Sequence, residues 1–165
     1  MAQTATVVTG EVAKRLQSEA GLPFAVSAIS ERDNISLGEL GADQVVSRNV
    51  APDIAEKSFN IRYPAFYVYC ERIVNDLAEK FRTFSGAAAM CVEVRVSHDR
   101  MDDIERRLQS YVEAVTDVLD ANRGTWPNGM YYGGKYEVAF GALKHGGKNF
   151  LQAAKVRFDV NISSD

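Results

Sequence analysis

The feature of the sequence that most restricts its fold is an apolar stripe of helical period in the second half of the chain. Its six side chains recur at the spacing of one helix face, and they are Ile104, Leu108, Tyr111, Val112, Val115 and Leu119. Asp99 can cap the start of this helix, and residues 122–124 (Asn-Arg-Gly) can end it. Burying such a face contributes on the order of 10 kcal/mol before entropy is subtracted. The helix must therefore pack on another apolar surface.

That surface is predicted to be an antiparallel sheet. Apolar and polar residues alternate in three segments, and a fourth is rich in aromatic and β-branched residues. The segments are residues 63–70, 88–96, 136–142 and 154–162. Gly146 and Gly147 predict a hairpin turn between the last two strands. The order strand, strand, long helix, hairpin predicts an α+β fold with a sheet of about four strands.

A shorter helix is expected to pack on the same face of the sheet as the long one. It is predicted from the spacing of Ile73, Leu77 and Phe81, which recur every four residues before Gly86. The sheet and these two helices together make up residues 60–165, the expected α+β core.

The first 59 residues give a weaker signal. A helix is predicted over residues 9–20, with Val8, Val12 and Leu16 on one face, and it ends before residues 21–23 (Gly-Leu-Pro). Residues 24–29 alternate like a short strand, and residues 30–57 show no periodicity, which predicts an extended arm. The whole chain is interpreted as a single domain, with an N-terminal helix (1–21), a strand and arm (22–59) and the core.

Charge and composition narrow the possible functions. The chain has 165 residues and a net charge of −3, without the basic excess of a general nucleic-acid binder. It shows no signal peptide and no apolar stretch of membrane-spanning length, so we expect synthesis in the cytoplasm and no membrane partner. Cys70 and Cys91 are too few for a disulfide framework.

No segment of the sequence nominates a catalytic, cofactor or metal site. Residues 144–148 (Lys-His-Gly-Gly-Lys) resemble a phosphate loop only in part, and a strand follows where that loop needs a helix. His98 and His145 have no ligating partner at zinc spacing. Acidic residues between 99 and 105 are explained by a helix N-terminus. We therefore expect no catalytic residue, no cofactor and no metal, and a protein that is not an enzyme.

Two sets of residues are candidates for a subunit or partner interface. The second face of the predicted sheet is charged with both signs, which favours water or a protein partner over nucleic acid; its residues include Glu93, Arg95, Lys135, Glu137, Lys155, Arg157 and Asp159. The other set, Trp126, Tyr131 and Tyr132, lies in a glycine-rich connector. Exposed aromatic residues favour interfaces, and packing beneath the loop is given equal weight.

Three stretches of the second half resemble a known family. They are residues 60–71 (NIRYPAFYVYCE), then residues 81–86 (FRTFSG) with the strand that ends at residues 95–100 (RVSHDR), and residues 136–160, from YEVAFG through KHGGKNF. In order and spacing they are similar to tail terminator and related neck proteins of tailed bacteriophages. The resemblance runs from residue 60 to the end of the chain and includes no catalytic motif.

The resemblance implies a structural virion protein that assembles in the host cytoplasm. Such a subunit forms a ring, usually a hexamer, that caps the tail tube and joins it to the head. Its partners would be further copies of itself, the tail tube protein and a neck or head-completion protein, with passive contact to DNA in the lumen. A head-side neck protein (adaptor or stopper) is the first alternative, and a small cytosolic α+β enzyme or ligand-binding domain is the second. Reversing the charges of Arg95 and Arg157 is expected to weaken assembly and leave the monomer folded.

Overall fold

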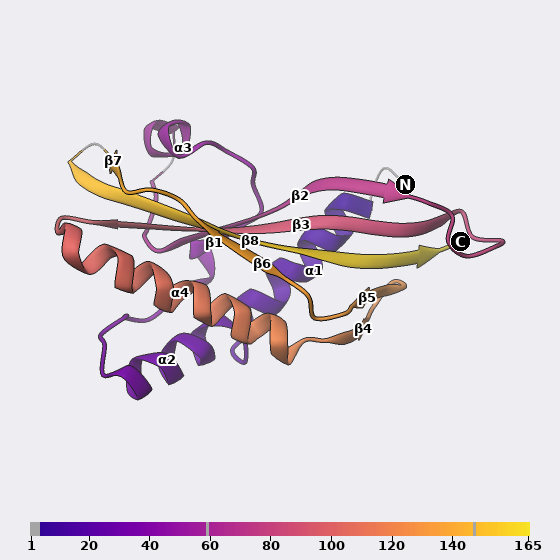
Figure 1. Cartoon of the computed structure of the whole chain (residues 1–165), viewed down its shortest axis with the longest axis horizontal. Coiled ribbons are helices and arrows are strands. Elements are labelled where there is room, and N and C mark those ends of the chain that lie inside the picture. Colours follow the sequence, from indigo (N-terminus) through magenta and orange to yellow (C-terminus); the bar gives the residue numbers. More distant parts are fainter. Residues whose placement is uncertain (1–3, 59, 147) are drawn as a thin grey trace.

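A twisted sheet divides the protein into two layers of unequal thickness (Figure 1). The computed structural model describes residues 4–58, 60–146 and 148–165. Helices α1 (Thr4–Gln17), α2 (Leu22–Asp33) and α4 (Met101–Ala121) pack on one face, and the short helix α3 (Pro52–Ser58) packs on the other. The predicted α+β class is confirmed.

The sheet has more strands than the sequence predicted. The described residues form eight strands in the order β1-β2-β3-β8-β5-β4, with β6 and β7 also paired to β8, instead of about four. Their bounds are β1 Val45–Val46, β2 Ala65–Asn75, β3 Phe84–His98, β4 Gly124–Trp126, β5 Met130–Tyr132, β6 Glu137–Phe140, β7 Lys144–Gly146 and β8 Asn149–Ser164. The pairings are antiparallel except that of β1 with β2. The strands that the prediction lacked are β1, β4, β5 and β7, all of three residues or fewer.

The long helix and the alternating strands are confirmed. All six side chains of the predicted stripe are buried on α4, and they meet the apolar face of the three long strands. Val68, Val92 and Val156 lie side by side on that face in β2, β3 and β8, and each is fully buried. The helix begins at Met101, one residue after Arg100 in the capping position, so Asp99 is not its N-cap.

The predicted hairpin near the end of the chain is also confirmed. Strand β6 pairs with β8 so that Val138 lies opposite Val156, and β7 continues the ladder to Gly146 opposite Asn149. Gly147, in the predicted turn, lies outside the described residues.

The N-terminal helix is confirmed with shifted ends. It spans Thr4–Gln17 and buries Val8, Val12 and Leu16 as predicted. Gly21 then lets the chain turn tightly, because a Cβ there would overlap the carbonyl oxygen of Arg15.

The predicted strand over residues 24–29 is wrong, because this segment belongs to α2. Pro23 occupies its first turn, where proline is well tolerated. Leu22, Val26 and Ile29 fall at helical spacing and are buried, whereas Phe24 points to solvent.

The predicted extended arm over residues 30–57 is also wrong, because the segment carries structure of its own. It contains the end of α2, a 3₁₀ turn (η1, Ala42–Gln44), β1 and α3. The Nε2 atom of Gln44 donates to the carbonyl oxygen of Pro64 at 2.9 Å, and the Tyr111 hydroxyl donates to that of Leu37 at 2.6 Å. These contacts fix the segment to the sheet and to α4.

The predicted shorter helix around Leu77 is absent from the described residues. Strand β2 continues to Asn75, and residues 76–83 form the turn that joins it to β3. Gly86 allows the two strands to approach, because a Cβ there would overlap the carbonyl oxygen of Val74. The turn lies at the right-hand end of Figure 1, beyond the helices.

Within the described residues, no helix is both long enough and apolar enough to cross a lipid bilayer.

Candidate interaction surface

The second face of the sheet is divided into two halves that meet different surroundings. Side chains alternate between the faces of a strand, so this face carries the odd-numbered residues of β3 and β8. We call the part beneath α3 and residues 47–51 and 60–63 the covered half; it comprises Tyr67, Tyr69, Cys91, Glu93 and Arg95. We call the remainder the open half; it comprises Arg72, Val74, Ala87, Ala89, Arg157, Asp159 and Asn161.

A buried ion pair lies at the centre of the covered half. Arg95 and Glu93 form a salt bridge and are only 3% and 6% exposed. The Arg95 guanidinium also donates to the carbonyl oxygen of Val50, and it lies 4.0 Å from the centre of the Tyr67 ring. Lys155 approaches Glu93 from the edge, at 3.7 Å. Charges inside a protein are stable only when paired in this way.

One nitrogen of this buried guanidinium has no hydrogen-bond acceptor among the described residues. It is Nη1 of Arg95, which is inaccessible to solvent. A buried donor without an acceptor has a free-energy cost. Burying the charged Arg95 guanidinium therefore lowers the stability of the folded state. Because Glu93 and Arg95 are buried within the chain, the expectation that they face water or a partner is wrong for the single chain.

Cys91 lies in the covered half and Cys70 packs against the core on the helical side, and both are poorly placed for nucleophilic chemistry. Cys91 is fully buried and burial raises the pKa of its thiol to about 11. Burial also raises the pKa of the partly exposed Cys70 thiol. A nucleophilic cysteine needs a lowered pKa. No group of His, Cys, Asp and Glu in the described part of the chain is arranged to hold a metal ion.

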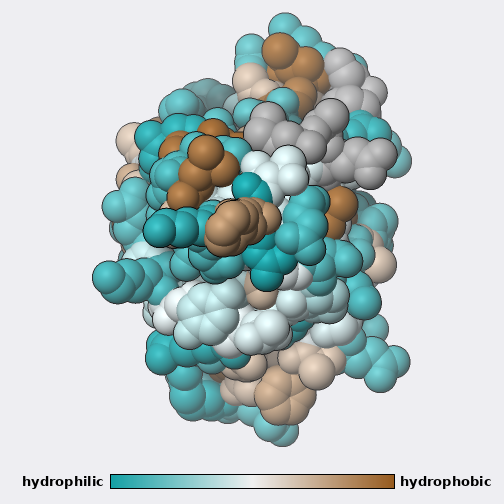
Figure 2. Space-filling view, turned by 90° about the vertical axis from the view of Figure 1, so that its right-hand side faces the viewer, coloured by the Kyte–Doolittle hydropathy of each residue, from teal (hydrophilic) through white to brown (hydrophobic). Residues whose placement is uncertain are grey.

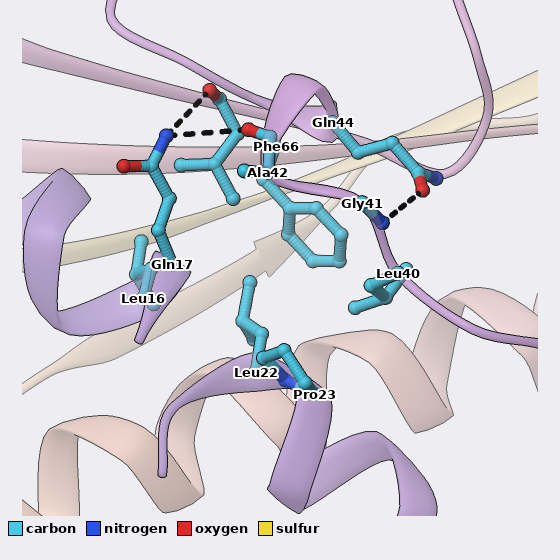
Figure 3. Close-up of a pocket in the computed structure, with 10 residues that line it drawn as sticks. Leu16, Gln17, Leu22, Pro23, Leu40, Gly41, Ala42, Gln44 and Phe66 are labelled. Carbon is cyan, nitrogen blue, oxygen red and sulfur yellow. Dashed lines mark hydrogen bonds between the residues drawn. The ribbon is translucent and has the colours of Figure 1, made fainter. Parts of the chain in front are cut away.

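A small cavity lies on the helical side, between α1, α2 and the segment around η1 (Figure 3). Its volume is about 30 Å³, and its walls include Leu16, Leu22 and Phe66. Figure 3 shows Gln17 at the left of the cavity, where its Nε2 donates to the carbonyl oxygens of Ala42 and Val45. A space of this size holds a water molecule and excludes an ordinary small-molecule ligand.

The open half forms a groove of about 890 Å³ on the surface. Ala89, a small residue of β3, leaves room at its floor, and Arg157 and Asp159 of β8 also line it. One wall is Glu71 and Arg72 of β2, and the opposite wall is residues 133–137 between β5 and β6. Glu71 accepts a hydrogen bond from Arg157 at 2.8 Å across the groove.

Beyond the groove, the β2–β3 turn holds apolar side chains in solvent. Phe81 is 100% exposed and Leu77 is 59% exposed. Both have positive φ angles, 66° and 49° respectively, a conformation uncommon for residues other than glycine. Figure 2 faces the end of the molecule that carries this turn and shows brown hydrophobic groups among teal hydrophilic surface.

The interface residues predicted from sequence are distributed over three places. Glu93 and Arg95 are buried in the covered half, with Lys155 half-exposed at its edge. Arg157 and Asp159 lie in the open half, as part of the groove.

The three aromatic residues predicted as part of the same interface also divide into exposed and buried residues. Tyr131 is exposed, whereas Trp126 and Tyr132 are buried against Phe158 and the end of α4. The indole Nε1 of Trp126 donates to the carbonyl oxygen of Asn122 at 2.7 Å. For these two residues the packing interpretation is correct, because β4 and β5 fold back on the helix.

Sequence reasoning missed Ala89, Arg72 and Tyr136 in the groove, and Leu77 and Phe81 in the turn. A signal was present for the turn, since Asp76, Glu79, Lys80 and Arg82 surround the two apolar residues. Such a density of charge is more typical of an exposed turn than of a helix that packs on a sheet. No local pattern marks Ala89, because its role depends on the strands beside it.

Comparison with known proteins adds no family assignment: no family model matches the chain, and no curated protein matches its sequence significantly.

Proposed function

We propose that this protein is a structural subunit of a tailed-bacteriophage virion, a tail terminator that caps the tail tube as a ring and joins it to the neck. The similarity of residues 60–165 to that family supports the proposal. The observation that carries it is the pair of unlike, unpartnered surfaces on one chain: the groove of the open half and the β2–β3 turn with Phe81 fully exposed.

A ring of identical subunits needs such a pair. Each subunit contacts its two neighbours through two different patches, so the surface on one side must fit the surface on the other. The covered half is buried within the monomer, where Arg95 pairs with Glu93 and donates to the carbonyl oxygen of Val50. We assign the open half and the turn to assembly, because the turn carries Phe81, which is fully exposed, and the open half carries the groove. This role requires no catalytic group, cofactor or metal.

Assembly and tube binding test the proposal together. Native mass spectrometry over a concentration series and negative-stain images are expected to show a closed ring near six subunits with a central opening. Co-sedimentation with purified tail tubes is expected to place the protein at tube ends. A protein that forms no ring and binds no tube would contradict the proposal, and binding to purified heads alone would favour the adaptor or stopper role.

A further inference from the structure

We infer that the β2–β3 turn of one copy inserts Phe81 and Leu77 into the open-half groove of a second copy. The contact is head-to-tail, with residues 76–83 as the inserted element and the groove between Arg72 and Tyr136 as the receptor. The inference rests on the proposed structural role and identifies the partner of the open half as another subunit.

The turn has the character of an inserted element. Its two apolar side chains are exposed on a hairpin that extends beyond the helical layer (Figure 1). The turn is held in shape from within: the Asn75 Oδ1 accepts from the backbone N–H groups of Leu77 and Ser85 at 3.3 and 3.0 Å. The Ser85 hydroxyl accepts from the N–H of Glu79 at 3.0 Å. Preorganisation of this kind lowers the entropic cost of binding.

The groove has the size and lining to receive it. Its volume of about 890 Å³ exceeds the space that one phenyl and one isobutyl group fill, and Ala89 leaves the floor low. Tyr136 contributes an aromatic wall and is 39% exposed. An aromatic anchor in a pocket with a polar rim is the usual centre of a protein interface.

Unpaired charges of both signs lie on each of the two surfaces. In the described part of the chain, four side chains on the groove rim form no ion pair: Arg72, Lys135, Glu137 and Asp159. On the turn, Arg82 pairs with Glu79 and Asp165, whereas Asp76 and Lys80 form no ion pair within the described residues. The turn has one unpaired charge of each sign, and the rim of the groove has two of each sign. The inserted turn can therefore be oriented in the groove with opposite charges facing each other and without net repulsion.

The turn of one chain cannot enter the groove of the same chain, because the turn joins β2 and β3 and these two paired strands also form part of that groove. An inserted phenyl group buries about 150–250 Å², below the roughly 1,000 Å² expected of a stable interface. Flanking turn residues and the groove rim must supply the remainder. Assembly should therefore depend on protein concentration, and each subunit in a closed ring gains two such contacts.

Cross-linking between two variants, each with one engineered cysteine, tests the contact directly. In a Cys70→Ser background, one variant carries Ala78→Cys, which keeps Phe81 and Leu77 in the turn, and the other carries Ala89→Cys; the buried Cys91 is retained in both. A short thiol cross-linker is expected to give covalent dimers when the two variants are mixed, and none with either variant alone. Dimers in either single-variant sample, or no dimer in the mixture, would overturn the inference.

A matched pair of exposed phenylalanines gives a second measurement. Phe81→Ser is expected to raise the concentration for half-assembly at least tenfold, whereas Phe24→Ser, on α2 and 67% exposed, is expected to leave it unchanged. Sedimentation velocity measures assembly, and thermal unfolding verifies that both variants fold. Equal effects, or a monomer at every concentration, would overturn the inference. If the protein stayed monomeric but still bound tail tubes, the inferred contact between copies would be overturned and the proposed function would be retained.

Discussion

The two halves of the second sheet face are built from the same strands, but the charged side chains are buried in the covered half and partly exposed in the open half. In the covered half, Glu93 and Arg95 are buried beneath α3 and residues 47–51 and 60–63. In the open half, Arg157 pairs with Glu71 at 2.8 Å with both side chains about one-third exposed. Strand alternation places all of these charges on one face, and only the covering segment decides which are buried.

The comparison teaches that a charged sheet face has two distinct uses. A buried pair strongly resists the loss of either partner, because the remaining charge has no water to solvate it. An exposed pair is screened and contributes little to stability. The covered half therefore belongs to the fold, and the open half is free to serve recognition.

The largest effect is expected from Arg95→Ala. It leaves Glu93 buried without its main partner, so the free energy of unfolding should fall by about 3–5 kcal/mol, measured by urea denaturation. Lys155, at 3.7 Å from Glu93, places the value toward the lower end. The charge reversal of Arg95 expected from sequence to spare the monomer should unfold it instead.

The double variant Glu93→Gln with Arg95→Met is the control for that prediction. It removes both charges and keeps most of the volume, so it should recover much of the lost stability. If Arg95→Ala alone proved harmless, the covered half would not be held by its ion pair.

An intermediate effect is expected from raising the pH. The pKa of the Cys91 thiol is raised by burial from 9.0 to about 11, so the folded state holds its proton more tightly than the unfolded state. Its contribution to stability is fully present below about pH 9 and is lost as the pH rises through about 11. Urea titrations between pH 8 and 11 should show a steeper loss for the native protein than for Cys91→Ala. Parallel curves would mean that the thiol is accessible to solvent.

The smallest effect is expected from Arg157→Ala in the open half. The pair with Glu71 is partly exposed, so its loss should cost only about 0.2–1 kcal/mol, by the same urea measurement. A cost as large as that of Arg95→Ala would erase the distinction between the halves.

The regular elements with strong periodicity could be predicted from the sequence. The stripe on α4 and the alternation in β3 and β8 are repeated over many residues, so the local pattern and the tertiary burial agree. The segment at 24–29 failed because a short apolar run fits both periods. Counting from Leu22 instead shows the helical set with Val26 and Ile29.

The candidate surface was harder to predict, because a segment distant in the sequence determines which part of the sheet face is buried. Arg95 and Arg157 both alternate outward in their strands, and nothing near either residue shows that Val50 lies against only one of them. The spacing of Ile73, Leu77 and Phe81 likewise imitates a helix, although the first lies in β2 and the others in a turn. Arg157 and Asp159 were placed on the outward face correctly, and the groove between them and β2 emerged only from the assembled sheet.

The pairing of β3 with β8 has a consequence for how the protein reaches its native state. Its register joins Phe84 to Ser164 and His98 to Phe150, residues far apart in the sequence, with α4 and four short strands between them. Such non-local contacts raise the contact order and slow folding, since a long loop must close before the ladder forms. The β2–β3 hairpin, with neighbouring strands, can form on the microsecond scale of local hairpins. The turn that carries Phe81 should thus be shaped early, well before β8 completes the groove, which would delay self-association until each subunit has finished folding.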